Sequence, residues 1–171
     1  MSSTILLLCG IAFLAGFVDA IVGGGGLIQT PAGLIMFPNE PVARVIGSLK
    51  IPSFTGTLFA AKQYLKKAPI PAARLVLFTS IAFAAAFFGS YCLTLVSNQF
   101  MKPVIFFVLV VIAIYTYTKK DLGLSSMVKE ANFPWYKGAA ICLLIGFYDG
   151  FIGPGAGSLL VLAFISWLGF D

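Results

Sequence analysis

Two aspartates lie inside apolar stretches of this sequence, each a few residues before a cluster of glycines. A shift of 130 residues places Asp19 on Asp149, and seven of fifteen positions around the two aspartates are then identical. A carboxylate within a membrane span costs roughly 2.5 to 3.5 kcal/mol even on lenient insertion scales, so such residues are usually functional. We expect the two aspartates to have a functional role. Alternatively, each one caps the half-helix that follows its glycines.

The repeated glycines predict an anion site. They remove side chains where a half-helix begins, so the backbone amides of residues 26–28 and 156–158 would point into a cavity with the positive end of the helix dipole behind them. The alternative is that the glycines only allow close helix packing. No Gly-Lys-Ser/Thr follows them and no Rossmann strand precedes them, which excludes a nucleotide site. The candidates are Gly23, Gly24, Gly25, Gly26, Gly153, Gly155 and Gly157.

Further polar side chains are candidates for the same site. Lys50 would lie about 9 Å deeper along its helix than Arg44, by the rise of six residues. There it could neutralise Asp19, attract an anionic substrate, or extend its ammonium to the membrane surface. Neutral hydrogen bonds to a bound oxyanion are expected from Gln29, Thr30, Ser48, Ser53 and Ser158.

The composition indicates a polytopic membrane protein. Sixty per cent of the 171 residues are hydrophobic, ten per cent are charged and none is histidine. Residues 75–96 and 103–118 contain no charge, and each is near the roughly 20 residues that cross a bilayer. The net charge of +5 comes from short loops that form no basic face, which argues against a nucleic-acid partner. The three cysteines lack the paired spacing of a metal site, so we expect no metal and no cofactor.

One long apolar tract must position the first aspartate. Residues 5–37 would make a single helix of about 50 Å, well beyond the bilayer core. Consecutive glycines each cost roughly 1 kcal/mol against alanine in a helix interior, so we predict a break at residues 23–26. The first repeat, residues 1–118, is predicted to contain this broken helix 5–37, with parts at 5–22 and 27–37, and membrane helices at about 41–64, 72–97 and 102–118.

The second repeat is expected to begin after a loop at residues 119–134. The positive-inside rule predicts that this loop lies in the cytoplasm. It occupies residues 135–171, with helices at about 136–152 and 156–169, and is therefore much shorter than the first repeat. We therefore expect a truncated chain or a partner that supplies the rest, with a naturally degenerate repeat as the alternative. The predicted fold is all-α, a polytopic helical membrane protein with two homologous repeats that contain glycine-broken helices, and we favour the inverted arrangement.

Three sequence segments resemble a known family. The GF-x-D motif before its glycines, the PNEPVARVIGSLKIPSFTG segment and the later GFYDGFIGPGAGS are similar to the sulfite exporter TauE/SafE family of transport permeases. The resemblance implies a multi-pass permease of a bacterial-type inner membrane that moves sulfite, sulfoacetate or related small sulfur-containing anions. It also implies seven or eight spans in two homologous halves, from which this chain departs by ending early.

We therefore expect a secondary carrier, and no enzyme, whose site forms where the two glycine breaks meet near the bilayer midplane. Helix amides and Lys50 would hold the small anionic substrate, and Asp19 and Asp149 would gate its movement or couple it to protons. One alternative is a non-catalytic membrane subunit that needs a partner, either a second copy or the missing C-terminal half. Another is an intramembrane aspartyl protease, although the Gly-x-Gly-Asp sequence expected for that chemistry is absent.

Overall fold

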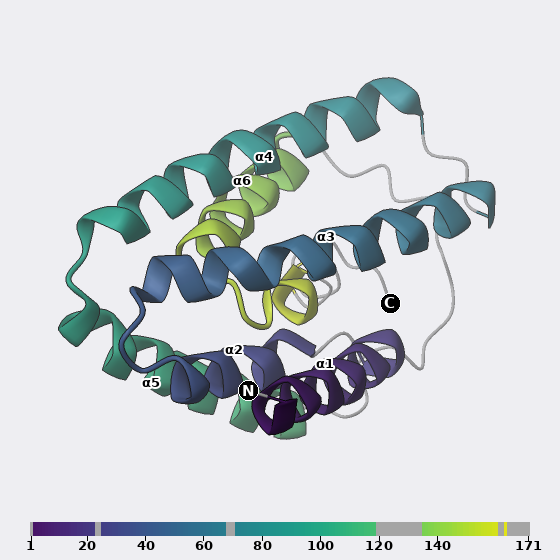
Figure 1. The fold of residues 1–171 in the computed structure, drawn as a ribbon. Helices are drawn as coiled ribbons and strands as arrows, with labels where there is room; N and C mark the ends of the chain where they lie inside the picture. The colour runs from purple at the N-terminus through teal and green to yellow at the C-terminus, as the bar shows by residue number, and fades with distance from the viewer. Residues whose placement is uncertain (1, 23–24, 68–70, 119–134, 161–162, 164–171) are drawn as a thin grey trace.

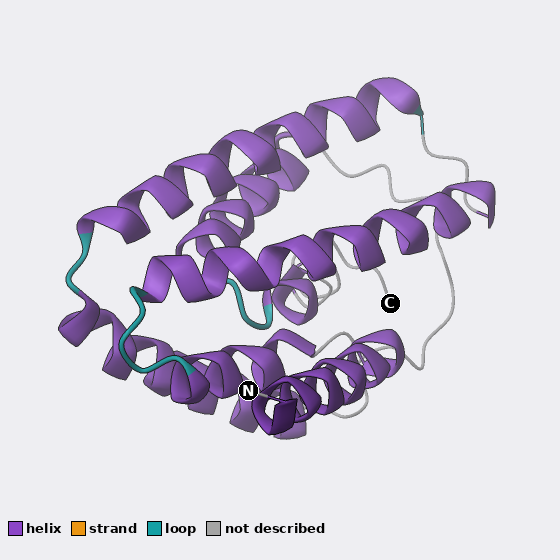
Figure 2. Ribbon diagram, viewed as in Figure 1, coloured by secondary structure: helices purple, strands orange, loops and turns teal. Residues whose placement is uncertain are grey.

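The computed structural model describes residues 2–22, 25–67, 71–118, 135–160 and 163 of the chain. Every regular element in these ranges is an α-helix, which confirms the all-α prediction (Figure 2). A further helical turn begins at Ala156. The helices are α1 (Ser2–Val22), α2 (Gly25–Met36), α3 (Val42–Lys67), α4 (Ala72–Leu95), α5 (Asn98–Thr118) and α6 (Trp135–Phe151) (Figure 1).

The long N-terminal apolar tract is divided between α1 and α2. The start of α2 lies directly against α1. A Cβ added at Gly25 would lie 2.6 Å from the Ala15 carbonyl oxygen and 2.7 Å from the Asp19 Cβ. The start of α2 therefore packs on the last turns of α1, and a glycine is required at this close approach. Gly23 and Gly24, the centre of the predicted break, lie outside the described residues.

The turn between α4 and α5 differs from the prediction. The sequence placed it at residues 98–102, whereas α4 ends at Leu95 and α5 already begins at Asn98. Ser97 occupies the position before the helix, and its carbonyl accepts hydrogen bonds from the amides of Phe100 and Met101. Helix α5 includes Pro103 in its second turn.

The hydrophobic core lies where the start of α3 and the end of α4 meet α5. Val42, Met101 and Ile105 are at most 1% exposed. The residue after α6, Ile152, belongs to the same cluster, so the core anchors the second glycine break. The complete cluster is Val42, Ile46, Leu93, Met101, Ile105, Leu109 and Ile152.

Helices α4 and α6 pack with their backbones in direct contact. A Cβ added at Gly146 would lie 2.7 Å from the Ala82 carbonyl oxygen, and one at Gly150 would collide with the backbone of Ala86. Gly89 of α4 in turn lies against the backbone of α6. The contacts advance in the same direction along both helices, so α4 and α6 run parallel. We call Ala82, Ala86, Gly89, Gly146 and Gly150 the α4–α6 seam; such small-residue contacts are typical of helix pairs in lipid.

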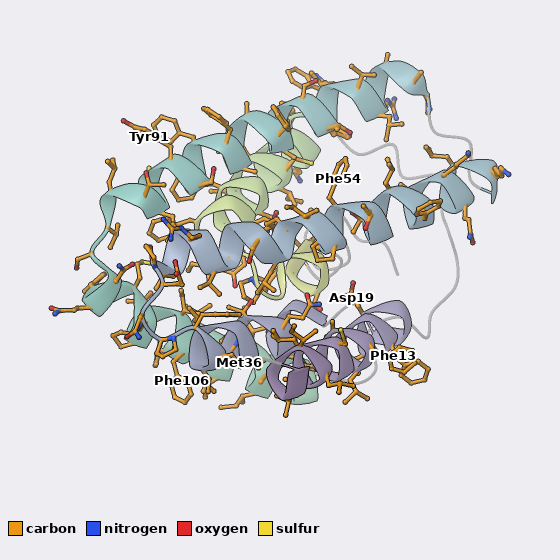
Figure 3. The ribbon with its side chains drawn as sticks, viewed as in Figure 1. Phe13, Asp19, Met36, Phe54, Tyr91 and Phe106 are labelled. Atoms are coloured by element: carbon orange, nitrogen blue, oxygen red, sulfur yellow. The ribbon has the colours of Figure 1, made fainter. Side chains whose placement is uncertain are left out.

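The outer surface of the helices is strongly apolar. Phe13, Ile35 and Phe83 are each more than 70% exposed, and similar side chains cover most of the other helices (Figure 3). A surface of this size suits hydrocarbon better than water. Among the described residues, α4 is the one helix whose length and composition suffice to cross a membrane, and shorter apolar helical stretches cover Ile5–Asp19 and Asn98–Ile114.

Candidate functional site

The second glycine break follows α6 directly. After Phe151 the backbone enters the left-handed region at Gly153, with φ of 92°, and again at Gly155, with φ of 77°. Both values favour glycine over any residue with a side chain. The Tyr148 hydroxyl donates a hydrogen bond to the Pro154 carbonyl at 2.7 Å, which fixes the turn against the end of α6.

The two glycine breaks are in contact. A Cβ added at Gly26 would lie 3.4 Å from the Pro154 Cα and 3.9 Å from the Gly155 nitrogen. A Cβ added at Gly155 would lie 3.5 Å from the Leu27 side chain. The missing side chains allow two half-helix starts, far apart in the sequence, to come together at one place.

Asp19 holds the start of α2. Its Oδ1 accepts a hydrogen bond of 2.8 Å from the Gly25 amide, the first amide of that helix. The Asp19 side chain is labelled in Figure 3. A carboxylate at a helix N-terminus satisfies an amide that lacks a partner within the helix and lies at the positive end of the dipole. The geometry therefore corresponds to the capping role that the sequence offered as the alternative for this aspartate.

This cap predicts different effects for two substitutions of Asp19. Asp19→Ala removes the acceptor and should destabilise the protein by about 1 kcal/mol, whereas Asp19→Asn keeps a carbonyl oxygen and should retain most of the stability. Thermal unfolding in detergent, with amide hydrogen exchange at residues 25–29, measures both effects. Equal destabilisation by the two variants would contradict the capping role and indicate that the charge itself is needed.

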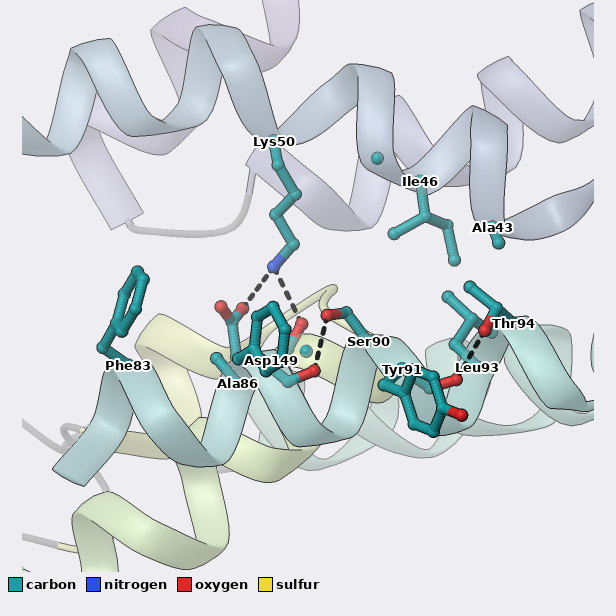
Figure 4. A pocket seen from close by; sticks show the side chains of 13 residues that line it. Ala43, Ile46, Lys50, Phe83, Ala86, Ser90, Tyr91, Leu93, Thr94 and Asp149 are labelled. Atoms are coloured by element: carbon teal, nitrogen blue, oxygen red, sulfur yellow. Dashed lines mark hydrogen bonds and ion pairs between the residues drawn. The ribbon is translucent and has the colours of Figure 1, made fainter. Parts of the chain in front are cut away.

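Lys50 of α3 pairs with Asp149 of α6. Its ammonium lies 2.6 Å from the Asp149 Oδ1 and donates a second hydrogen bond of 2.9 Å to the main-chain carbonyl of the same residue (Figure 4). The two side chains are 39% and 41% exposed, so the pair is neither sealed in the interior nor fully open. Of the three roles that the sequence offered for Lys50, neutralisation of an aspartate is found, but the partner is Asp149 and not Asp19.

A cleft of about 460 Å³ opens beside this ion pair, between α3, α4 and α6 (Figure 4). Its charged lining residues are Lys50 and Asp149, and the rest of its surface is largely apolar. Three hydroxyl groups of α4 also line it, those of Ser90, Tyr91 and Thr94. Sequence reasoning missed these three, although the spacing of four between Ser90 and Thr94 places both on one face of the helix, within the charge-free residues 75–96.

The glycine candidates of the second break lie on both sides of the turn. Gly153 is beside the ion pair, since a Cβ added there would lie 3.1 Å from the Lys50 Nζ. Gly157 lies in the helical turn that follows the break. The amide of Ala156 donates to the Gly153 carbonyl at 3.3 Å, so this predicted anion donor is used within the turn itself.

The neutral polar candidates lie apart from the cleft. Within the part of the chain that the structure describes, none of Gln29, Thr30, Ser48, Ser53 and Ser158 lines it. Thr30 is 4% exposed, and the Ser48 hydroxyl donates to the Val45 carbonyl. The two aspartates also have different partners, which does not match the shared-proton pair of an aspartyl protease.

Comparisons with known proteins agree with a membrane role. Residues 8–171 match the family described as Sulfite exporter TauE/SafE. The chain is 33% identical over 159 residues to a probable membrane transporter protein, ORF9, of a Sinorhizobium species, which covers 93% of this chain and 60% of the relative. A probable membrane transporter protein of Haemophilus influenzae is 30% identical over 166 residues, covering 97% of this chain and 64% of that protein.

A third relative, the probable membrane transporter protein YfcA of Escherichia coli K12, is 29% identical over 162 residues, or 94% of this chain and 59% of the relative. The chain thus spans about three fifths of the length of the curated relatives it matches. No solved structure matches it significantly.

Proposed function

The chain belongs to the sulfite exporter TauE/SafE family, and from this premise we propose that it is a secondary membrane transporter for small sulfur-containing anions such as sulfite or organosulfonates. The related proteins are named as probable membrane transporters, which supports transport over enzymatic chemistry. We place the chain in a bacterial-type inner membrane as a multi-pass protein, with residues 119–134 in the cytoplasm and the two repeats inverted.

One observation carries this proposal: two glycine breaks touch one another beside a lysine that faces an open cleft. Discontinuous helices that meet at a repeat interface are the usual location of a transporter's binding site. In this proposal the anion lies against the half-helix starts and Lys50, and the two aspartates act in gating or proton coupling, Asp19 through the half-helix start that it caps. The Gly25 and Ala156 amides already have acceptors, and the principal charged contact is Lys50, the cation that lines the cleft.

Transport by the purified chain tests the proposal. Liposomes that contain the protein and are loaded with sulfite should release it faster than protein-free liposomes, with a rate that saturates as internal sulfite rises. Excess methanesulfonate should compete, because it presents a similar oxyanion, whereas a small alkylammonium cation should not. Sulfite release equal to that of protein-free liposomes would contradict the proposed function.

A further inference from the structure

We propose that Lys50 exchanges partners during transport: it holds Asp149 in the empty site, and it binds a monovalent sulfonate or bisulfite only when a proton has neutralised Asp149. This inference rests on the proposed function and specifies its substrate charge and its coupling. It predicts that one proton accompanies each anion. It also separates the two aspartates, since Asp19 remains a helix cap while Asp149 carries the proton.

The contacts of the ammonium support an exchange. Among the described residues, both acceptors of the Lys50 ammonium belong to Asp149, one from the side chain and one from the main chain. An ammonium has three donors, so at least one remains for a ligand even while the pair is closed. Movement of the single Asp149 carboxylate then opens a second donor. Gly153 leaves space beside the ammonium, because any side chain there would begin 3.1 Å from it.

The charge of the site determines which ligand fits. The Lys50–Asp149 pair is neutral, and an added anion would leave one net negative charge in a membrane site, where net charge is costly. A proton on Asp149 and a monovalent anion on Lys50 together keep the site neutral. The proton forms the neutral carboxylic acid, and the anion takes the position that the carboxylate leaves at the ammonium. A divalent anion would retain one uncompensated charge and is disfavoured.

The other titratable groups nearby are few. Those that line the cleft are Lys50 from α3, Tyr91 from α4 and Asp149 from α6. Tyr148 adjoins Asp149 in the chain, but its hydroxyl is held by the Pro154 carbonyl. Asp19 is bonded to the start of α2. Asp149 is therefore the acid in direct contact with the lysine.

Binding of methanesulfonate as a function of pH tests the exchange. This probe stays a monovalent anion across the working range, so any pH dependence belongs to the protein. For the wild-type chain in detergent, Kd should rise by up to about tenfold for each unit of pH increase, the limit for one linked proton. Asp149→Asn should abolish this dependence, because the amide cannot titrate. The control Glu40→Gln removes an exposed acid that is paired with Arg44 outside the cleft, and it should keep the wild-type slope.

A second measurement needs no variant. When methanesulfonate is added to weakly buffered wild-type protein, the protein should take up protons as the anion binds. At the midpoint of the pH dependence it should take up one proton for each two anions bound, and at higher pH close to one proton for each anion. Binding without proton uptake would overturn the inference. An Asp149→Asn variant that keeps the wild-type slope would also overturn it and would point to titration of another group such as Lys50. Absence of any methanesulfonate binding would instead contradict the proposed function.

Discussion

Replacement of Lys50 by methionine is expected to slow sulfite release from liposomes by about ten- to a hundredfold. A hydrogen bond to a charged group contributes about 1.5 to 3 kcal/mol, and about 1.4 kcal/mol corresponds to a tenfold change in affinity. Lys50 is the cation that lines the cleft, and the amides of Gly25 and Ala156 cannot replace it because they already have acceptors. The initial rate of release, compared at equal protein content, measures the effect.

Two further variants separate loss of the charge from loss of the fold. Lys102→Met removes a lysine that donates to the Pro38 carbonyl away from the cleft, so transport should continue near the wild-type rate. The double variant Lys50→Met, Asp149→Asn removes the uncompensated carboxylate that the single variant leaves behind. It should unfold at the wild-type temperature and still fail to transport. Near-normal transport by Lys50→Met would show that this lysine does not bind the anion.

Replacement of Gly150 by alanine is expected to destabilise the protein by about 3 kcal/mol, the upper part of the usual range for overpacking. The added methyl group would collide with the backbone oxygen, carbonyl carbon and Cα of Ala86. Backbone atoms cannot move aside by a change of rotamer, so α4 and α6 would have to separate along the whole α4–α6 seam. Thermal unfolding in detergent and elution on size exclusion measure the loss.

The two repeats provide a matched control for this prediction. Gly16 and Gly146 are equivalent positions, yet a Cβ at Gly16 meets nothing within 4 Å while one at Gly146 meets the Ala82 backbone. Gly16→Ala should therefore be neutral or should stabilise α1 by up to about 1 kcal/mol. Gly146→Ala should resemble Gly150→Ala. Equal stability of the Gly16 and Gly146 variants would show that the seam tolerates side chains.

Much of the fold was accessible from local patterns. Hydrophobic runs of membrane length predicted helices, and the observed α3 and α4 begin within a residue of the expected positions. Glycine clusters located the ends of α1 and α6 because their backbone requirements are local. The start of α5 was expected near residue 102 and lies at Asn98, after a turn in which the Ser97 carbonyl accepts hydrogen bonds from the amides of Phe100 and Met101.

The site depended on tertiary contacts that spacing does not encode. The repeat suggested equal roles for Asp19 and Asp149, but one bonds a nearby amide and the other a lysine 99 residues away. Which carboxylate reaches Lys50 is decided by how α6 packs on α4, and the seam contacts that determine this packing join segments far apart in sequence. The hydroxyls of Ser90 and Thr94 were missed because α4 reads as a plain lipid-facing span.

The α4–α6 seam also determines how the two walls of the cleft are held. With their backbones touching, α4 and α6 form one closely packed pair that carries both Asp149 and the hydroxyl-bearing wall of the cleft. The opposite wall is α3, which contributes Lys50. The Lys50–Asp149 contact therefore joins α3 to the α4–α6 pair at the cleft, and the buried residues Val42, Ile46 and Leu93 join the start of α3 to the end of α4.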